Sequence, residues 1–511
     1  MKYLENIEPR EYQQKIFETC SKKNCLVVLP TGIGKTLIAL MLTVRRMEEY
    51  PEEKIVFLAP TKPLAEQHLN TFKKHLPELF ADMQLFTGKI NSSNRKKIWK
   101  TADIIFSTPQ CIANDLKNRL YDVSEVSLLI EDEAHKCIRN YAYNYIAQKY
   151  MQQAKHKRIL GLTASPGGDS NKIKEICRNL FIDEVEVRTR NSEDVIEYLQ
   201  ELEFEKIFVD FPPELYELKI ILEKLFNRYV DDLKKRRVLW DFPSKTNLIK
   251  LQRRLIMNIS KEKNFNNMLA LSGCAQAIKI QHILDLLETQ NISNVQTYLK
   301  ELFKQASEKK SRGVEKLVQN PEINLINIKI NELMIKDFKH PKIDKLIEII
   351  NKEINENKKF KAIVFTQYRE SAATISKLLN KIKGINSKVF IGQAKKLGSG
   401  MSQNEQRDIL EEFSSGKINI ICATSIAEEG LDIPEVNDVI FYEPVPSAIR
   451  AIQRAGRTAR LMKGKLIILL TKKTRDETNY YVSRAKEKKM YGAIEKIKKE
   501  FSSKEKQKTL Q

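Results

Sequence analysis

Two groups of residues in this sequence have the types and spacing of a nucleotide-phosphate site. The first follows the apolar run CLVVLP (25–30), where TGIGKT ends on Gly34, Lys35 and Thr36. A glycine-rich turn between a strand and a helix lets backbone N–H groups surround phosphates at the helix N-terminus. We expect Lys35 to bind the β- and γ-phosphates and Thr36 to bind Mg²⁺. The general P-loop has a further glycine where this chain has Leu29, so an ordinary turn is the alternative interpretation.

The second group is the acidic end of SLLIEDEAHK (127–136), which carries Asp132 and Glu133. If 127–131 forms a buried parallel strand, its carboxyl end faces the same sheet edge as the turn at Gly34. Asp132 then suits Mg²⁺ and Glu133 suits the attacking water, because phosphoryl transfer depends mainly on positioning and charge neutralisation. A solvated strand end is the alternative, and the preceding P-loop weakens it.

A third group lies far downstream, where Arg454, Arg457 and Arg460 recur every three residues in IRAIQRAGRTAR. This spacing places guanidinium groups on one helical face, from which they could reach across a cleft. An arginine that stabilises charge on a γ-phosphate contributes ~10³–10⁵ in rate. A solvated or nucleic-acid-binding face is the alternative. A site split in this way would make closure of the cleft depend on the nucleotide.

Short apolar runs bounded by turn residues are the elements that must position these groups. Such runs are typical of fully buried parallel strands. Between Pro213 and about Phe338 the apolar residues instead follow helical spacing. We therefore predict an α/β protein with two parallel-sheet domains and an all-helical domain inserted between them. The expected bounds are 1–204 and 341–480 for the sheet domains, 205–340 for the insert and 481–511 for a basic tail. The strand-like segment 206–211 fits either sheet domain, and we expect the basic tail to be a helix that frays into a disordered end.

Length and charge narrow the class of protein. A chain of 511 residues is too long for one core at ~100–200 residues per domain, so about three domains are expected. The formal net charge, 88 − 66 = +22, favours a polyanionic partner, of which nucleic acid is the commonest and a membrane surface the competitor. We find no apolar run of about 18 residues and no signal-peptide pattern, so we expect no membrane partner and a cytoplasmic location.

The cysteines do not indicate a metal or disulfide framework. They are odd in number, scattered, and never spaced as CxxC. Buried thiols are the simplest interpretation of Cys20, Cys25, Cys111, Cys137, Cys177, Cys274 and Cys422.

The ordered set of motifs resembles the DExH-type superfamily 2 helicases over roughly residues 8–470. Within that superfamily the sequence is similar to archaeal Hef and the Fanconi anaemia group M helicase, through FIGQAKK, MSQNEQRDILEEF and FYEPVPSAIRAIQRAGRTAR. The RIG-I-like and Dicer helicases are also similar and share a helical insert, but they act on double-stranded RNA. The motifs are PREYQ, LPTGIGKT, APTKPLAEQ, STPQ, EDEAH, LTASPG, IVFTQYRESA, ATSIAEEGLDIP and IQRAGRTAR.

This resemblance implies two RecA-like domains that bind ATP and Mg²⁺ between them, and it assigns roles to single residues. Arg10 and Gln13 would read the adenine edge, and Gln453, Arg457 and Arg460 would close over the phosphates. The remaining assignments are ATP contacts at Thr31, Gly32, Gly34, Glu429, Gly430 and Asp432, coupling at His135, Thr163 and Ser165, and contacts to a strand backbone at Thr61, Thr108, Gln367, Gly392 and Thr424.

Two departures from the pattern of Hef bear on function. Ala459 stands where many relatives have glycine, which is a mild change if the residue is helical. Nothing after Thr471 provides the carboxylate motif of the Hef nuclease, so we expect any cutting to need a partner. Lys234–Arg237 and Gln252–Arg254 resemble the part of the Hef insert thought to grip branched duplex, although such runs also occur as solvated faces.

The leading interpretation is an ATP-dependent DNA helicase or translocase that remodels branched DNA such as replication forks in DNA repair and fork restart, moving 3′ to 5′ by family likeness. A separate nuclease or sliding clamp could be its partner. Three alternatives stay open: an ATPase activated by double-stranded RNA, a nucleic-acid-binding scaffold with an inactive ATP site, and a translocase of the restriction or chromatin type.

Overall fold

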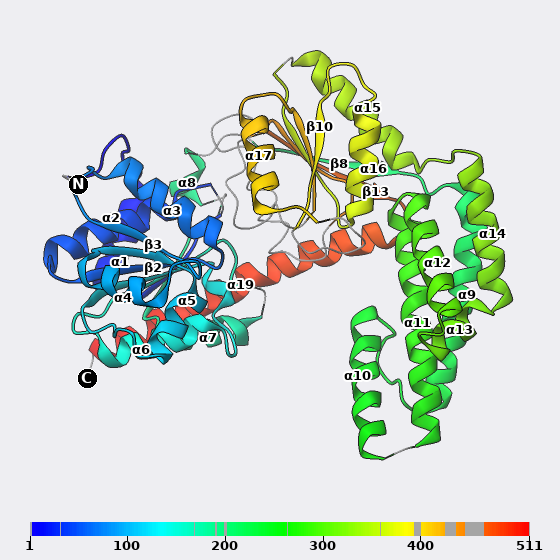
Figure 1. Cartoon of the computed structure of the whole chain (residues 1–511), viewed down its shortest axis with the longest axis horizontal. Helices are drawn as coiled ribbons and strands as arrows, with labels where there is room; N and C mark the ends of the chain where they lie inside the picture. The colour runs from blue at the N-terminus through cyan, green and yellow to red at the C-terminus, as the bar shows by residue number, and fades with distance from the viewer. Residues whose placement is uncertain are drawn as a thin grey trace.

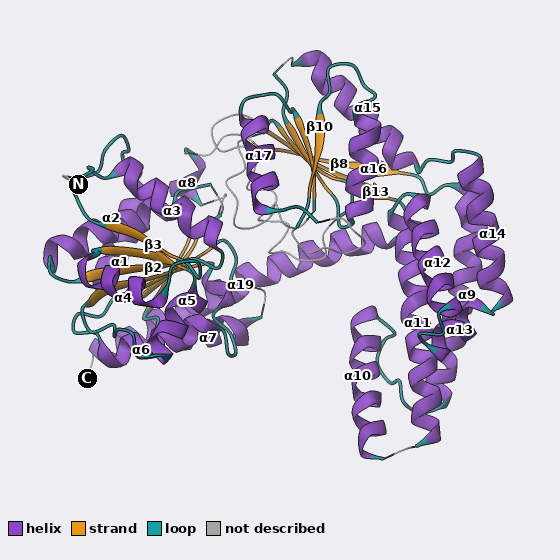
Figure 2. Cartoon of the chain, in the orientation of Figure 1, coloured by secondary structure: helices purple, strands orange, loops and turns teal. Residues whose placement is uncertain are grey.

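The chain folds into two parallel-sheet domains joined by a bundle of helices, as the apolar runs predict (Figure 1). The computed structural model describes residues 3–30, 32–167, 169–189, 192–198, 202–262, 264–357, 359–392, 400–424, 436–444 and 464–509. In that part of the chain both sheets are parallel throughout, and helices cover both faces of each sheet (Figure 2).

The first sheet has the strand order β3-β4-β2-β5-β6-β1-β7. Its strands are β1 (Cys25–Val28), β2 (Lys54–Leu58), β3 (Met83–Phe86), β4 (Ile104–Ser107), β5 (Val126–Asp132), β6 (Ile159–Thr163) and β7 (Glu184–Val187). The helices around it are α1 (Glu11–Lys22), α2 (Lys35–Glu49), α3 (Lys62–His75), α4 (Ser92–Thr101), α5 (Pro109–Lys117), α6 (Ala142–Gln153), α7 (Ser170–Asn179) and α8 (Glu193–Ile196), with a short 3-10 turn η1 (Ala134–Lys136). One apolar core lies on each face of this sheet.

The second sheet has the order β10-β11-β9-β12-β13-β8 and again carries an apolar core on each face. Its strands are β8 (Leu202–Val209), β9 (Ala362–Phe365), β10 (Ser387–Phe390), β11 (Ile420–Ala423), β12 (Asp438–Phe441) and β13 (Gly464–Thr471). The described helices of this domain are α15 (Pro341–Glu356), α16 (Arg369–Leu379) and α17 (Gln403–Ser414).

The structure departs from the expected bounds at the start of the insert. Strand β8 pairs with β13 along its whole length, so residues 205–209, expected in the insert, lie in the second sheet. The strand lies at the sheet edge, where Glu203, Glu205 and Lys206 face water, and such charges are typical of an edge. The helices of the insert are α9 (Pro213–Lys235), α10 (Lys245–Lys261), α11 (Phe265–Thr289), α12 (Ile292–Ser307), α13 (Arg312–Val318) and α14 (Pro321–Ile335).

A long final helix returns the chain to the first domain. Helix α19 (Arg475–Thr509) begins beside the second sheet and ends near α6 (Figure 1). Met490, Ala493, Ile494 and Ile497 recur at helical spacing and are buried in a core of the first sheet. The helix expected in the basic tail is thus present, and it continues to Thr509 and packs on the first domain.

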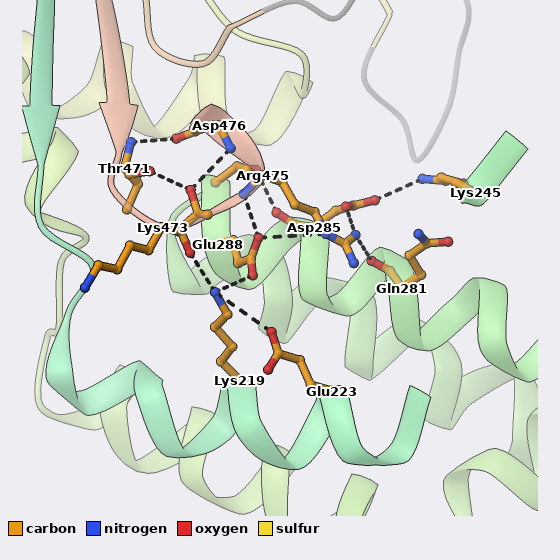
Figure 3. A network of polar contacts seen from close by, with 12 residues as sticks. Lys219, Glu223, Lys245, Gln281, Asp285, Glu288, Thr471, Lys473, Arg475 and Asp476 are labelled. Atoms are coloured by element: carbon orange, nitrogen blue, oxygen red, sulfur yellow. Dashed lines mark hydrogen bonds and ion pairs between the residues drawn. The ribbon is translucent and has the colours of Figure 1, made fainter. Parts of the chain in front are cut away.

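A polar network joins the insert to the second domain at the turn before α19 (Figure 3). Arg475 forms an ion pair with Asp285 of α11, and its backbone N–H donates to a carboxylate oxygen of Glu288 at 2.9 Å. The ammonium of Lys219 on α9 lies 2.9 Å from the other oxygen of Glu288, which is 4% exposed. This network connects α9 and α11 of the insert to the segment that follows β13 of the second domain.

Two further sequence expectations can be compared with the structure. All seven cysteines are buried free thiols, as their scattered spacing predicts. Over the residues described here, no helix combines the length and apolar character that crossing a membrane requires.

Candidate ATP and nucleic-acid sites

The phosphate-binding turn joins β1 to α2 and takes a conformation that its glycines allow. Gly32 and Gly34 have φ of 88° and 86°, in the left-handed region that side chains disfavour. A Cβ atom at Gly34 would overlap the side-chain amide of Gln13. Gly34 is also the N-cap of α2, so Lys35 and Thr36 begin the helix where backbone N–H groups point outward. This arrangement suits an anion such as a nucleotide phosphate.

Lys35 is held inside this turn. Its ammonium donates to the backbone carbonyl oxygens of Leu29 at 2.9 Å and Pro30 at 3.4 Å. Carbonyl oxygens are weaker partners for an ammonium than phosphate oxygens, because a charged acceptor strengthens the hydrogen bond. The lysine is therefore positioned where it can exchange carbonyl contacts for phosphate contacts.

The start of α1 packs against the phosphate-binding turn. Gln13, 3% exposed, donates from its side-chain amide to the carbonyl oxygen of Ile33 at 3.3 Å, and the hydroxyl of Tyr12 donates to the same oxygen at 2.6 Å. The guanidinium of Arg10 lies 5.1 Å from the ring centre of Tyr198. Arg10 and Gln13 thus border the turn, and their contact with adenine stays a prediction.

Asp132 lies at the carboxyl end of β5 and is oriented by two neighbours. Nε2 of His68 on α3 lies 2.9 Å from a carboxylate oxygen of Asp132, and the hydroxyl of Tyr143 donates to its backbone carbonyl at 2.6 Å. Burial alone raises the pKa of Asp132, but the hydrogen bond and charge of His68 and the charge of Lys35 lower it below its ordinary value. An ionised carboxylate and the hydroxyl of Thr36 are oxygen ligands of the kind that Mg²⁺ prefers.

Glu133 is the first residue of a chain of polar contacts. It has φ of 52°, a left-handed conformation that turns the backbone sharply after β5. Nδ1 of His135 lies 3.1 Å from a carboxylate oxygen of Glu133 and 3.2 Å from the hydroxyl of Thr163. That hydroxyl accepts from the backbone N–H of Ser165 at 3.1 Å. The three predicted coupling residues therefore lie in one connected path from Glu133.

The strand order explains why these residues meet. Strand β6, which ends at Thr163, lies between β5 and β1, and all three are parallel. Their carboxyl ends therefore share one sheet edge, with the phosphate-binding turn on one side and Asp132 on the other. This is the edge at which open α/β sheets bind ligands.

In the first domain, the two predicted contacts to a strand backbone lie further along the same edge. Thr61 and Thr108 are the N-caps of α3 and α5, which follow the neighbouring strands β2 and β4. Thr61 is exposed and Thr108 is half-buried. Helix N-termini at adjacent strand ends offer backbone N–H groups to phosphates, as the predicted role requires.

In the second domain, the three predicted contacts follow the neighbouring strands β9, β10 and β11. The backbone N–H of Gln367 donates to the carboxylate of Glu443, and Gly392 accepts at 3.2 Å from the guanidinium of Arg369. Thr424 is 7% exposed and its N–H donates to Phe390. All three lie at one sheet edge, and their contact with nucleic acid stays a prediction.

Eight of the predicted ATP-site residues lie outside the described part of the chain. One belongs to the phosphate-binding turn and the other seven to the second domain. They are Thr31, Glu429, Gly430, Asp432, Gln453, Arg454, Arg457 and Arg460.

Two contacts at the site were not predicted from the sequence. His68 binds Asp132 from the buried face of α3, where Ala65 and Phe72 are also buried. A histidine on the apolar face of a helix is expected to be buried and to need a polar partner, and this was the signal in the sequence that could have indicated the contact. The hydroxyl of Ser165 donates to the sulfur of Met490 on α19 at 2.7 Å, a contact between distant segments that no local pattern indicates.

Three family models match successive parts of the chain. "Type III restriction enzyme, res subunit" matches residues 6–168, and "Helicase conserved C-terminal domain" matches residues 341–462. "Putative ATP-dependent RNA helicase, helical bundle" matches residues 214–337, which are the helices of the insert.

Curated relatives match nearly the whole chain. A protein of Methanocaldococcus jannaschii named "Putative ATP-dependent RNA helicase" is 38% identical over 95% of this chain and 60% of its own length. ATP-dependent DNA helicase MPH1 of Debaryomyces hansenii is 32% identical over 91% of this chain and 47% of its own length. The Fanconi anemia group M protein homolog of Mus musculus is 29% identical over 96% of this chain and 26% of its own length. The chain thus spans at most 60% of these relatives.

A solved structure covers the same extent. The crystal structure of the Pyrococcus furiosus Hef helicase domain is similar with a TM-score of 0.71 and 40% sequence identity. The match covers 93% of this chain and 98% of that one. Both sheet domains and the helical insert therefore have counterparts in one known helicase domain.

Proposed function

The chain belongs to the family of superfamily 2 helicases that includes Hef and the Fanconi anaemia group M protein, and from this membership we propose that it is an ATP-driven motor that remodels branched DNA such as replication forks. DNA repair and fork restart are the proposed setting, and 3′ to 5′ the proposed direction of movement.

One observation carries this proposal: a basic helical insert accompanies two sheets whose carboxyl edges hold the candidate ATP and strand-backbone residues. Residues 234–268 run from the end of α9 through α10 to the start of α11. They contain ten basic and two acidic side chains, a net charge of 10 − 2 = +8. Such a charge favours duplex or branched nucleic acid through its phosphates.

The described residues supply the proposed chemistry in the first domain. Lys35 binds the β- and γ-phosphates, while Thr36 and Asp132 would hold Mg²⁺, which neutralises phosphate charge when bound. Glu133 orients the attacking water. His135 contacts both Glu133 and Thr163, so a change at the water position reaches the segment toward the nucleic acid.

Hydrolysis becomes movement in this proposal because the second domain completes the site. Gln453, Arg457 and Arg460 would close over the phosphates, and release of phosphate would open the cleft again. The insert would move with the second domain, since the network of Arg475, Asp285 and Glu288 joins them. Each cycle would then shift the insert relative to the first domain.

A double-stranded-RNA-activated ATPase is the second candidate. The names of the Methanocaldococcus relative and of the family model that matches the insert favour it, since both refer to RNA helicases. The name of the MPH1 relative, an ATP-dependent DNA helicase, favours DNA.

The rate of ATP hydrolysis with different activators tests the proposal. Purified protein is assayed with fork DNA, linear duplex DNA, single-stranded DNA and duplex RNA at equal nucleotide concentration and fixed salt, because affinity for phosphates depends on salt. We expect fork DNA to stimulate most. Stimulation by duplex RNA alone would select the second candidate, and no hydrolysis with any activator would leave only a binding protein.

A further inference from the structure

The loop between α9 and α10 exposes two aromatic side chains. In this segment, residues 236–244, which we call the aromatic loop, Trp240 is 77% exposed and Phe242 is 81% exposed. Large aromatic side chains dominate the energetics of interfaces when they are covered, and their grouping on a surface marks an interaction site. The residue between them is Asp241, so the two rings lie close along the chain.

The exposure of these rings is a feature of an ordered loop. Leu239 anchors the loop, since it is only 4% exposed. The guanidinium of Arg254 on α10 donates to the carbonyl of Val238, and the side-chain amide of Asn247 donates to the carbonyl of Phe242 at 3.0 Å. The backbone is thus fixed on both sides of Trp240, and a ligand that covered the ring would pay little ordering entropy.

The charge around the loop selects the kind of ligand. Lys234, Lys235, Arg237 and Arg253 are all exposed, and residues 234–268 carry the net charge of +8 given above. A positive surface with exposed flat rings is the combination that binds single-stranded nucleic acid, because phosphates pair with the cations and bases stack on the rings. An acidic protein would match the charge but has few flat faces to offer the two rings.

We propose that Trp240 and Phe242 form a stacking site for unpaired bases at the branch point of DNA. This inference rests on the proposed function and specifies which part of the DNA, the unpaired bases, these two side chains would bind. In an intact duplex the face of each base is covered by its neighbours, so an aromatic ring stacks only where pairing or stacking is broken. The site would therefore distinguish a fork from linear duplex. The basic residues alone would not, because they contact phosphates, which both forms of DNA carry.

The position of α10 agrees with this role. Helix α10 lies on the side of the insert that is turned toward the first domain (Figure 1). The aromatic loop leads directly into α10. Ser244 is the N-cap of α10, and its hydroxyl oxygen accepts a hydrogen bond from the backbone N–H of Asn247 at 3.2 Å. DNA held by the edge of the first sheet could thus extend toward the loop.

Intrinsic fluorescence can report on the proposed site directly. The chain has two tryptophans. Trp99 is 6% exposed and stacks on Tyr121 with ring centres 3.8 Å apart, so DNA cannot reach it. Quenching by added DNA therefore reports on Trp240.

The experiment titrates the full chain with a fork that has unpaired arms and with linear duplex of the same length, and records tryptophan emission, binding by anisotropy and ATP hydrolysis in the same samples. We expect the fork to quench Trp240 far more than duplex at equal saturation. Trp240→Ala with Phe242→Ala should weaken fork binding roughly 5- to 100-fold and leave duplex binding within about 2-fold. Tyr216→Ala is the matched control, because Tyr216 is an aromatic residue of α9 that is 56% exposed and lies outside the aromatic loop.

Three results would overturn the inference. Equal quenching by fork and duplex would mean that the loop senses phosphates or general proximity. A fork that binds and stimulates hydrolysis without quenching Trp240 would leave the loop to a protein partner, with the proposed function intact. Dissociation of a dimer by Trp240→Ala in sedimentation would identify the loop as a contact between two copies. Failure of the proposed function looks different, since then no DNA stimulates hydrolysis.

Discussion

The hydroxyl of Ser165 donates to the sulfur of Met490, which lies 325 residues further along the chain. Ser165 ends the path of contacts that begins at Glu133, and Met490 belongs to the helix that starts beside the second sheet. The final helix therefore connects the candidate coupling segment of the first domain with the turn that holds the insert.

Met490→Ala should destabilise the first domain by about 2–5 kcal/mol, because the side chain is fully buried and its removal leaves a cavity. Met490→Leu is the matched control and should cost less than about 1.5 kcal/mol, since it nearly conserves volume. Urea unfolding followed by the emission of Trp99, which lies in the same core, measures both in a Trp240→Phe background. Equal stability of the alanine variant and wild type would mean that α19 does not pack there in solution.

Lys35→Ala should reduce ATP hydrolysis by roughly 10²–10³-fold, the range seen when one donor to a transition-state charge is removed. DNA affinity should stay within about 2-fold, because most binding free energy comes from phosphate contacts elsewhere. Steady-state hydrolysis and anisotropy on the same preparation check both. Loss of DNA binding in a folded variant would refute this division of labour.

His68→Ala should raise the Mg²⁺ concentration for half-maximal hydrolysis by roughly 10- to 100-fold, since residues that orient a metal-binding carboxylate typically have effects of this size. The ring of His68 touches Asp132, whereas His75 on the same helix is half-buried and its Nδ1 lies 3.0 Å from the backbone oxygen of Glu5, so His75→Ala is the control. A Mg²⁺ titration of the hydrolysis rate makes the comparison. If both variants behave like wild type, His68 serves packing alone.

The sequence predicts the centres of both sheets better than their edges. Strands β1, β2 and β5 are continuous apolar runs because they are buried on both faces, and such runs are visible without an alignment. The edge strands β3 and β7 are short and partly polar, MQLF and EVEV, so they carry no such signal. Strand β8 alternates charged and apolar residues and fits either sheet until its pairing with β13 is known.

Contacts between distant segments could not be predicted from the sequence. The apolar stripe of Met490, Ala493, Ile494 and Ile497 lies in a lysine- and glutamate-rich segment, which resembles a solvated tail by composition. Likewise, local spacing places His68 on a buried helical face but not beside Asp132. The motif residues Lys35, Asp132 and Thr163 were predictable as one site because parallel strands end at one edge.

Asp438 in the second sheet should make stability depend on pH. Burial, and then the charge of Glu353, raises the pKa of this carboxyl to about 7, and one of its oxygens has no hydrogen-bond partner. A folded pKa above the unfolded value of about 3.9 favours the folded state at low pH, and this stability is lost as pH rises through about 7. The penalty at pH 8 is at most about 4 kcal/mol.

Asp438→Asn removes the ionisation and keeps the shape, so it should raise the melting temperature at pH 8 and have a smaller effect at pH 5. Thermal unfolding across this range, recorded for wild type and variant, gives the difference directly. A variant that gains the same stability at both pH values would show that Asp438 does not titrate in this window.

Real-time opening of a DNA fork tests the central claim most directly. A fork with a fluorophore and a quencher on its two arms is mixed with wild type or with Glu133→Gln, with and without ATP and Mg²⁺. We predict that wild type separates the strands only with ATP, while Glu133→Gln binds ATP and fork but leaves the fork closed, because its side chain no longer orients water as a carboxylate. Fork opening by Glu133→Gln at the wild-type rate, or faster opening of duplex RNA by wild type, would contradict the account.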